Sequence, residues 1–394
     1  MALEKRLQKE SKLLTQLVVS CLTGRSVSQE SLDGVNIELL YRLAKLHELH
    51  NLIGYAIKQN GLDVPQEFSV VFDNAREACL CLTASQIAAA ELVKKTLSEK
   101  CVHHILLKGS VIRSLYPSED MRTSGDIDIL YNEDDIDEDS LESMMKSLGF
   151  EKTKGSVTVD TFSNGVCVFE MHRKLCSKAK EDFIPEHMQK LFDSANNGQY
   201  EMKLSCEDFY VYHVSHMAKH FCSHGCGIRP LADMYLLLKE YGKDLDREAV
   251  DKYLAEVGLC EFERNAREIV FGIFSGTELT DVQKEMYNMM MFSGIYGNTT
   301  RSAANERAKS KNGEGGKLKN LAKTAFLPLE NMRVKYPILK KTPVLLPVMW
   351  IVRVFDVFLK KSDKIKNTVA RYNGVDEDEI NRTIELYKSL GLGK

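Results

Sequence analysis

Apolar residues recur at spacings of three and four along much of the chain, which is the period of an amphipathic helix. In the first hundred residues this spacing runs through the segment 30–61, which Gly61 can end. The apolar positions of that segment are Leu39, Leu43, Leu46, Leu49 and Ile53. The same texture continues up to residue 100 and returns after residue 176, so most of the chain is predicted to be helical.

Strand patterns replace the helical period between these two stretches. Short apolar runs at 103–110 and 126–132 predict two strands, and 157–172 predicts a hairpin that turns at Ser163-Asn164-Gly165. One amphipathic helix, ended by a glycine, is expected at 138–150. The chain therefore has the pattern of an α+β protein, with a small mixed-sheet core flanked by N-terminal and C-terminal helical regions.

The changes of pattern divide the chain into four parts. We expect an N-terminal helical region at 1–100, an α/β core at 101–200, a helical region packed on the core at 201–298, and a basic loop with C-terminal helices at 299–394. The stretch 299–319 is rich in Gly, Asn, Ser and Lys, which is typical of an exposed loop.

Composition excludes several classes of protein. The 394 residues are 44% hydrophobic and 28% charged, which is unlike a collagen or a disordered chain. A formal net charge of −3 is too small to mark the whole molecule as a nucleic-acid binder. The ten cysteines are scattered rather than clustered, which fits a reducing cytoplasm. The longest apolar run, 343–352, is too short for a membrane span, so none is expected.

Positive charge gathers in one late segment. Residues 301–366 hold sixteen Lys and Arg against five Asp and Glu, and they enclose Trp350, the only tryptophan. Around Trp350 the apolar residues wrap most of a helical circumference, which favours burial in protein. The flanking lysines and the tryptophan would also suit a peripheral contact with anionic lipid or another protein. Both alternatives stay open.

Candidate chemistry is concentrated in residues 106–130. A short strand runs into Gly109-Ser110 and then a helix-like segment, a turn whose backbone N–H groups can approach an anionic ligand. Asp126 and Asp128 follow at strand spacing, so both carboxylates are expected on one side of a strand. Like charges so close together are costly unless a cation lies between them, and oxygen ligands suit Mg²⁺ or Mn²⁺.

A third carboxylate is available on the predicted hairpin. Glu170 lies on its second strand, and Asp160 on the first strand is the rival candidate. A phosphate-binding turn with three such carboxylates is what two-metal phosphoryl or nucleotidyl transfer requires.

At these positions the sequence resembles the nucleotidyltransferase superfamily of DNA polymerase β. More narrowly, it resembles an uncharacterised bacterial nucleotidyltransferase family with an L-K-G, Y-P, R-x-S-x-D-x-D-x-L pattern. That pattern stands here at Leu107-Lys108-Gly109, Tyr116-Pro117 and 122–130. An E-x-H strand and an H-x-x-x-H helix followed by an aspartate complete the resemblance at Glu170-Met171-His172, His216, His220 and Asp233.

The resemblance implies a metal-dependent enzyme that transfers a nucleoside monophosphate from an NTP to a hydroxyl-bearing acceptor and releases pyrophosphate. It implies two Mg²⁺ or Mn²⁺ ions, with Asp126, Asp128 and Glu170 as catalytic residues and metal ligands. The implied nucleotide-binding residues are Gly109, Ser110, Lys108, Arg122 and Ser124. Possible additional site residues are His172, His216, His220 and Asp233. The acceptor is expected to be a small molecule or a protein, because no basic, aromatic-rich stripe for nucleic acid borders the motif.

Three structural alternatives stand beside these roles. Lys108 could be a surface lysine, and Arg122 could pair with the acidic run 133–139. The histidines at 213, 216, 220 and 224, with Cys222 and Cys226 close by, could hold zinc in a non-catalytic, nucleotide-sensing or regulatory protein. The simplest interpretation of these histidines is that they line a helix packed against the α/β core.

Overall fold

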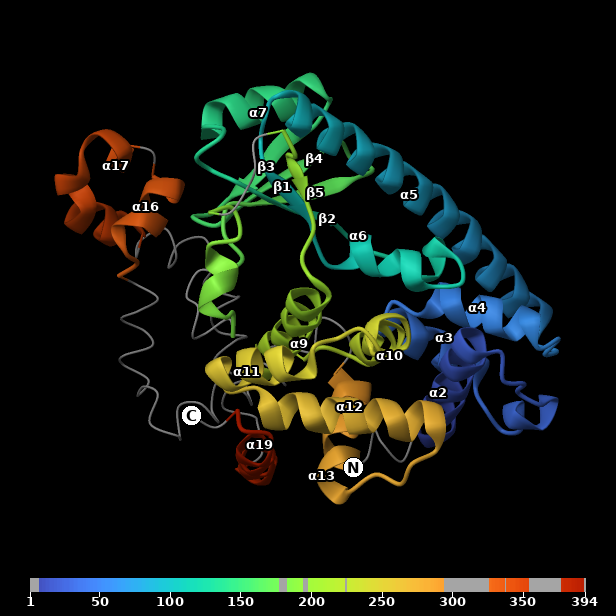
Figure 1. Cartoon of the computed structure of the whole chain (residues 1–394). Helices are drawn as coiled ribbons and strands as arrows, with labels where there is room; N and C mark the ends of the chain where they lie inside the picture. Colours follow the sequence, from blue (N-terminus) through green and yellow to red (C-terminus); the bar gives the residue numbers. More distant parts are fainter. Residues whose placement is uncertain are drawn as a thin grey trace.

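The structure, a computed structural model, describes residues 7–176, 183–193, 198–223, 225–293, 326–336, 338–353 and 377–392. Figure 1 shows a β-sheet at one end of the molecule and a body of helices at the other. The predicted α+β class is confirmed, because a six-stranded mixed sheet is combined with helices that precede and follow it in the chain. None of the helices in these ranges is long and apolar enough to cross a membrane.

The sheet has the strand order β3-β4-β5-β2-β1-β6. Its strands are β1 (His104–Leu106), β2 (Ile127–Tyr131), β3 (Glu151–Gly155), β4 (Val159–Ser163), β5 (Val168–His172) and β6 (Glu201–Met202). The central strand β2 pairs antiparallel with β1 and parallel with β5. Every residue of β2 is buried, as expected of a strand covered on both faces.

The predicted hairpin is confirmed as β4 and β5. Asn164 at the turn accepts hydrogen bonds from the backbone N–H groups of Val166 and Cys167, and Gly165 takes the left-handed φ of +86° that glycine allows. The predicted helix beside it is α7 (Glu138–Ser147). Asp137 caps its N-terminus through a hydrogen bond from the Ser140 N–H, and its apolar side chains join the core of the sheet.

The helical segment predicted at 30–61 contains two α-helices. They are α3 (Ile37–Leu46) and α4 (His50–Gln59), separated by a turn at which Glu48 has a φ of +53°. Leu46 is consequently exposed, although the leucine spacing continues through it. The turn is stabilised by an ion pair between Glu48 and Arg229 and by a hydrogen bond from Thr123 to the Glu48 carbonyl. Both partners are distant in sequence.

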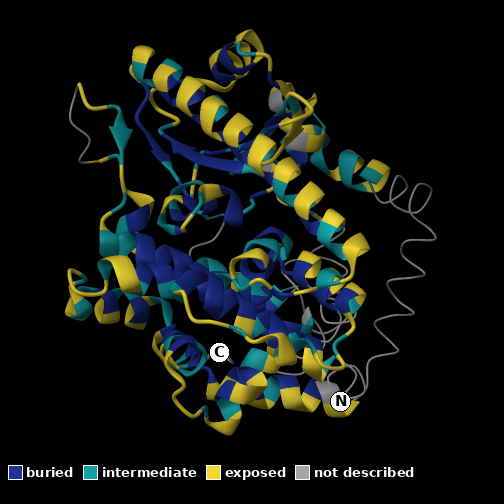
Figure 2. Cartoon of the chain, turned by 90° about the vertical axis from the view of Figure 1, so that its right-hand side faces the viewer, coloured by how far each residue is buried: buried dark blue, intermediate teal, exposed yellow. Residues whose placement is uncertain are grey.

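Helix α5 (Gln66–Glu99) connects the helical body to the sheet. Phe72 near its start packs in the core of the helical body, whereas Val93 and Leu97 near its end pack in the core of the sheet. Its outward side is exposed along the length of the helix (Figure 2). Helix α5 therefore packs against both the helical body and the sheet and helps to fix their relative orientation.

The helical body has one continuous apolar core. N-terminal helices such as α2 (Gln8–Thr23) and α4 share it with residues of the predicted 201–298 region. The later helices are α9 (Cys206–Ser223), α10 (Arg229–Tyr241), α11 (Arg247–Val257), α12 (Cys260–Ser275), α13 (Asp281–Ser293) and α19 (Glu377–Ser389). Leu386 and Leu390 bring the end of the chain into the same core.

Residues 326–353 form a small unit beside the rest of the molecule (Figure 1). It contains α16 (Leu329–Lys335), α17 (Ile338–Lys341) and the 3₁₀ turn η5 (Pro343–Leu345), followed by helical residues 346–353. In the Trp350 segment Val344, Val348 and Ile351 are exposed, whereas Leu346, Met349 and Trp350 are partly buried, so the described residues leave both alternatives for this segment open. The loop predicted at 299–319 lies outside the described residues.

Candidate active site

The chain leaves β1 alongside β2 and turns sharply at Lys108. The Leu107 N–H donates to the Asp128 carbonyl, which continues the pairing of the two strands by one residue. Lys108 then adopts a φ of +48°, an uncommon conformation for a residue other than glycine. The short helix α6 (Gly109–Ile112) follows directly. This turn brings the Lys108 side chain back toward the acidic residues of β2.

Asp128 is the centre of the site. Its Oδ1 accepts a hydrogen bond from Lys108 Nζ at 2.6 Å and is 2.8 Å from His172 Nε2. The side chain of Asp128 is only 3% exposed, whereas that of Lys108 is 21% exposed. Burial alone would raise the pKa of Asp128, but Lys108 and His172 outweigh it and hold that pKa well below its usual value. Asp128 is therefore an anion at neutral pH.

Asp126 lies just before β2, which begins at Ile127, and not within the strand as predicted. Burial and, after it, the negative charge of Asp128 raise the pKa of Asp126 to about 6, with Lys108 opposing the shift. The two aspartates thus have opposite pKa shifts. In this structure the cation in contact with Asp128 is the Lys108 ammonium group.

Glu170 and His172 reach the site from the neighbouring strand. Asp128 and Glu170 are direct partners in the parallel pairing of β2 with β5, and His172 lies two residues further on the same side. His172 Nε2 is 3.6 Å from Glu170 Oε2. Within the described residues, Asp128, Glu170 and His172 are the group whose possible ligand atoms all lie within 4.8 Å of one another. Two carboxylates with one imidazole suit a divalent cation such as Mg²⁺ or Mn²⁺.

Asp160, the rival third carboxylate, faces the opposite side of the sheet. It is paired with Met171 in the hairpin, one residue out of phase with Glu170. Its carboxylate forms ion pairs with Arg173 and with Lys152, the latter at 3.1 Å. Asp160 is a buried structural residue, and the hairpin register leaves Glu170 as the third carboxylate on the face of Asp128.

The comparison with known proteins decides the family. A family model described as "Uncharacterised nucleotidyltransferase" matches residues 33–274, which is more than half of the chain. The protein belongs to this family. It is a nucleotidyltransferase, and the match includes every site residue from Lys108 to Asp233. No curated protein and no solved structure matches the chain.

In this nucleotidyltransferase, the motif residues Tyr116, Arg122 and Asp233 form a buried clamp behind the Gly109 turn. Arg122 Nη2 is 3.0 Å from Asp233 Oδ2, and the Tyr116 hydroxyl donates to Asp233 Oδ1 at 2.8 Å. The predicted alternative partner of Arg122, the acidic run 133–139, is wrong, because Asp233 on α10 takes that place. The clamp ties the loop after α6 to the helical body.

Gly109 and Ser124 lie against the same clamp. A Cβ atom on Gly109 would lie 2.1 Å from Arg122 Nη1 and 3.0 Å from Ser124 Oγ, so only glycine fits there. Ser124 Oγ donates to the Asp126 carbonyl at 2.9 Å and thereby holds the segment that leads into β2. Ser110, the first residue after Gly109, is half-buried. The space that the missing side chain leaves at Gly109 is thus already taken by the Arg122 guanidinium group.

Helix α9 packs over the site and contributes a residue that the sequence did not single out. Tyr212 is buried, and burial raises its pKa well above its usual value, with Lys108 opposing and Asp128 adding to the shift. Tyr212 and His216 are four residues apart, so they share one side of α9. Partial burial and the nearby Lys108 charge hold the pKa of His216 well below its usual value, so this imidazole is neutral.

The other histidines of α9 have structural partners. His213 Nε2 is 3.0 Å from the Pro230 carbonyl, and His220 Nε2 is 3.0 Å from His216 Nε2. The interpretation of these histidines as a helix packed against the core is confirmed. Among the described residues, the histidines and cysteines of α9 belong to no three-residue metal-ligand group, and His224 lies outside those residues. The zinc alternative therefore gains no support.

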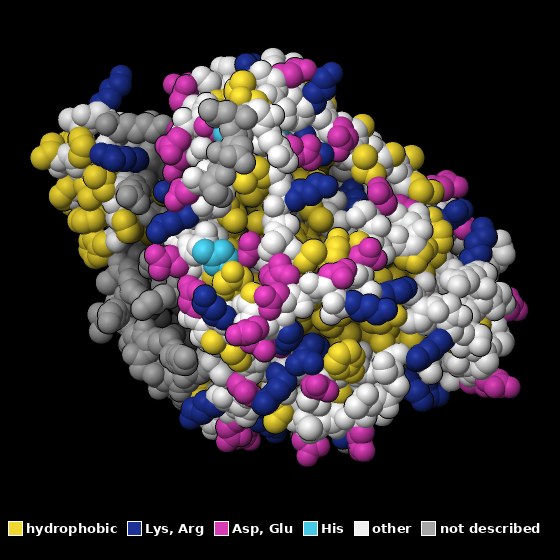
Figure 3. All heavy atoms as spheres, viewed as in Figure 1, with side chains coloured by type: hydrophobic (Ala, Val, Ile, Leu, Met, Phe, Trp, Pro, Cys, Tyr) yellow, Lys and Arg dark blue, Asp and Glu magenta, His cyan; other side chains and the backbone are white. Residues whose placement is uncertain are grey.

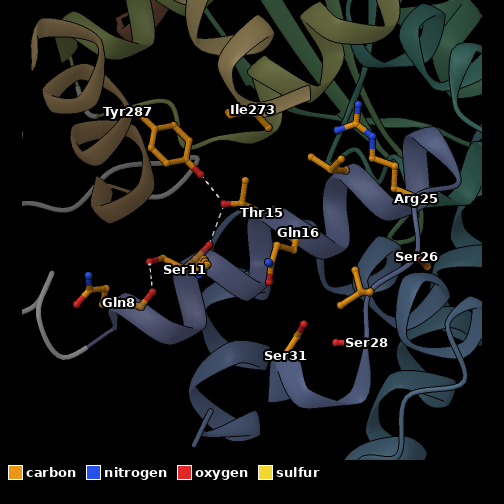
Figure 4. Close-up of a pocket in the computed structure, with 13 residues that line it drawn as sticks. Gln8, Ser11, Thr15, Gln16, Arg25, Ser26, Ser28, Ser31, Ile273 and Tyr287 are labelled. Atoms are coloured by element: carbon orange, nitrogen blue, oxygen red, sulfur yellow. Dashed lines mark hydrogen bonds between the residues drawn. The ribbon is translucent and has the colours of Figure 1, made fainter. Parts of the chain in front are cut away.

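A separate hollow of about 750 Å³ lies between α2, residues 25–31 and helices α12 and α13. Figure 4 shows polar side chains around it, with a hydrogen bond of 2.5 Å between Thr15 Oγ1 and the Tyr287 hydroxyl on its wall. None of its lining residues belongs to the acidic site. This hollow and the acidic site are distinct features of the nucleotidyltransferase.

Proposed function

We propose that this nucleotidyltransferase transfers a nucleoside monophosphate from an NTP to a hydroxyl-bearing acceptor, a small molecule or a protein, and releases pyrophosphate. The observation that carries the proposal is the convergence of Asp128, Glu170 and His172, with Asp126 adjacent, on one face of the central strands. The resemblance to the superfamily of DNA polymerase β and to bacterial relatives supports the same reaction class.

We further propose that Mg²⁺ or Mn²⁺, in a pair of ions, is held by Asp126, Asp128 and Glu170, with His172 as an additional ligand or as a hydrogen-bond partner of Asp128. The donor set fits such cations, because it is rich in carboxylate oxygen and contains no thiol. When bound, divalent cations neutralise the charge that develops on the phosphates during transfer. The low pKa of Asp128 keeps one ligand ionised across the physiological range.

Lys108 has a role that follows from its present partner. Its ammonium group contacts Asp128 Oδ1, the oxygen that Asp128 would otherwise offer to a metal ion, so Lys108 must leave Asp128 when a cation binds there. The turn at Lys108 places its side chain at the boundary of the site with 21% of its area still exposed. We propose that Lys108 then contacts the triphosphate, for which an ammonium group is a suitable partner.

Gly109 and Ser110 are proposed to bind phosphate through backbone N–H groups and the Ser110 hydroxyl. Arg122 and Ser124 act on the nucleotide indirectly in this proposal, because both support the turn from behind. Tyr212 and His216 are placed to contact the nucleotide or the acceptor from α9. The scattered cysteines form no disulfide among the described residues, which agrees with the proposed cytoplasmic location.

The reaction class is tested by incubating the protein with each of the four α-labelled NTPs and Mg²⁺, with and without cell lysate. Label that stays with the protein would identify a protein acceptor, and label on a small lysate component would identify a small-molecule acceptor. Pyrophosphate must appear in proportion to the label transferred. No transfer of label from any NTP, with Mg²⁺ or Mn²⁺ present, would refute the proposed reaction.

A further inference from the structure

The unit formed by residues 326–353 exposes an unusual amount of apolar surface. Val344 is 81% exposed and Ile351 is 60% exposed. The exposed apolar side chains of the unit are Phe326, Ile338, Val344, Val348, Ile351 and Val352. Single exposed apolar residues are ordinary, but a contiguous group marks a surface that contacts another molecule.

The group has an inner and an outer side. Met332 of α16 and Leu339 of α17 are fully buried and mark the inner side. Val348, Ile351 and Val352 are three and four residues apart in a helical segment, so they share one face. Figure 3 shows hydrophobic side chains gathered on the outer side of this unit, with Lys or Arg side chains beside them. We call this surface the apolar face of the unit.

Basic residues outnumber acidic residues in the unit that carries the apolar face. Residues 326–353 hold five Lys and Arg against one Glu, and Lys335 and Lys341 are exposed. An apolar surface bordered by Lys and Arg is complementary to an anionic bilayer, which offers acyl chains below negative headgroups. A second copy of the chain is a poorer occupant, because a symmetric contact would bring two basic surfaces together.

Trp350 adds an aromatic group at the base of the face. Its indole N–H donates to the Leu327 carbonyl at 2.8 Å, and its ring meets Phe326 edge-on at 5.3 Å between centroids. The indole is half-buried and holds the two ends of the unit together. An amphipathic indole ring at the base of an apolar face is typical of side chains that lie at the boundary between lipid headgroups and acyl chains.

We propose that residues 326–353 dock the nucleotidyltransferase on an anionic lipid surface, with the apolar face inserted at the headgroup boundary and the flanking basic residues on the headgroups. The unit lies outside residues 33–274, which carry the family match and the acidic site. Docking is therefore independent of the proposed function, and its test requires no NTP.

The test is flotation of the full-length protein with vesicles made of equal parts phosphatidylcholine and phosphatidylglycerol, and with phosphatidylcholine vesicles alone. We expect flotation with the anionic vesicles at low salt, weakening as the Debye length falls from ~10 Å at 0.1 M salt to ~3 Å at 1 M. Trp350, the only tryptophan, reports the contact directly, because its emission should shift to the blue on docking. Absence of flotation and of any emission shift at low salt would overturn the proposal.

Two variants locate the contact. Val344→Asp and Ile351→Asp should each weaken vesicle binding at least about tenfold. Each replaces an apolar group inserted in the lipid with a carboxylate that has the same sign of charge as the anionic headgroups. Val166→Asp is the matched control, since Val166 is 60% exposed on the β4–β5 turn and should leave binding unchanged. Equal binding by all three variants would overturn the proposal. A dimer that forms without vesicles and is lost in Val344→Asp would instead assign the face to a second copy.

Discussion

Lys108 Nζ lies 2.6 Å from Asp128 Oδ1, and this ion pair is formed by the second residue after β1 and the second residue of β2. Asp128 also contacts His172, so one buried carboxylate has two cationic or hydrogen-bonding partners. The proposed metal ligand is therefore neutralised by the protein itself. A metal ion bound at Asp128, as proposed, would compete with Lys108 for that carboxylate, and this competition can be measured without knowing the acceptor.

Replacing Lys108 should separate metal binding from nucleotide binding. Lys108→Met should bind Mn²⁺ roughly fivefold more tightly, since a partly exposed ion pair is worth about 1 kcal/mol. The same variant should bind a non-hydrolysable NTP analogue roughly tenfold more weakly, because a charged phosphate contact is lost. Electron paramagnetic resonance of free Mn²⁺ and calorimetry give the two constants. Lys154→Met on β3, an exposed lysine, is the control and should change neither constant. If Lys108→Met strengthened both kinds of binding or weakened both, the proposal that Lys108 moves from Asp128 to the triphosphate would be contradicted.

Removing the charge of Asp128 should cost stability in the absence of metal. Asp128→Asn leaves Lys108 without its anionic partner, and we expect a loss of about 1–3 kcal/mol in the free energy of unfolding at pH 7. The depressed pKa of Asp128 means that its contribution is present above the unfolded-state value and disappears as the pH falls through the folded-state value. Denaturant titrations of the metal-free protein at pH 7 measure this. A variant as stable as the wild type would show that the Lys108 pair contributes nothing.

Asp126→Asn should have the opposite effect on stability. The pKa of Asp126 is raised from 3.8 to about 6 in the folded protein, so the ionised carboxylate opposes folding above that pH. The variant should be more stable than the wild type by about 1–3 kcal/mol above pH 7, and this gain should shrink toward zero near pH 4. Thermal midpoints between pH 4 and pH 8 without metal provide the comparison. A gain that grows at low pH would contradict the raised pKa.

Glu170 and Asp160 can be separated by two matched variants. Glu170→Gln should reduce nucleotidyl transfer at least about 100-fold and change stability little, because Glu170 is a partly exposed proposed ligand. Asp160→Asn should cost about 2–4 kcal/mol of stability, because it breaks buried ion pairs with Arg173 and Lys152, without lowering the activity of folded protein. Stability comes from denaturant titration and activity from label transfer. The reverse pattern would make Asp160 the functional carboxylate.

Much of the fold could be predicted because local patterns agree with the final structure. The hairpin turn at Asn164-Gly165 and the glycine after α7 both follow from short-range preferences. The break between α3 and α4 could not be predicted in this way. It depends on Glu48 in a left-handed conformation held by Arg229, which is 181 residues away in the chain.

The candidate site shows the same contrast between features set by local sequence and features set by contacts distant in the chain. The spacing of Asp126 and Asp128 and the E-x-H strand identify the acidic residues, because alternation along a strand is a local property. The choice between Glu170 and Asp160 requires the hairpin register, which the sequence did not determine. The pairing of Arg122 with Asp233 joins residues 111 positions apart, and Tyr212 has no motif around it. These contacts are set by how α9 and α10 pack on the sheet.

The central claim is that Asp128 and its neighbours perform nucleotidyl transfer, and the most direct measurement is the rate of label transfer from α-labelled NTP by wild type and Asp128→Asn. We expect transfer with equal release of pyrophosphate in the wild type when Mg²⁺ is present. The variant, assayed under conditions where it is folded, should be slower by at least about 100-fold, since metal stabilisation of a transition state is worth several kcal/mol. Asp128→Asn with the full wild-type rate would contradict the assignment of this site.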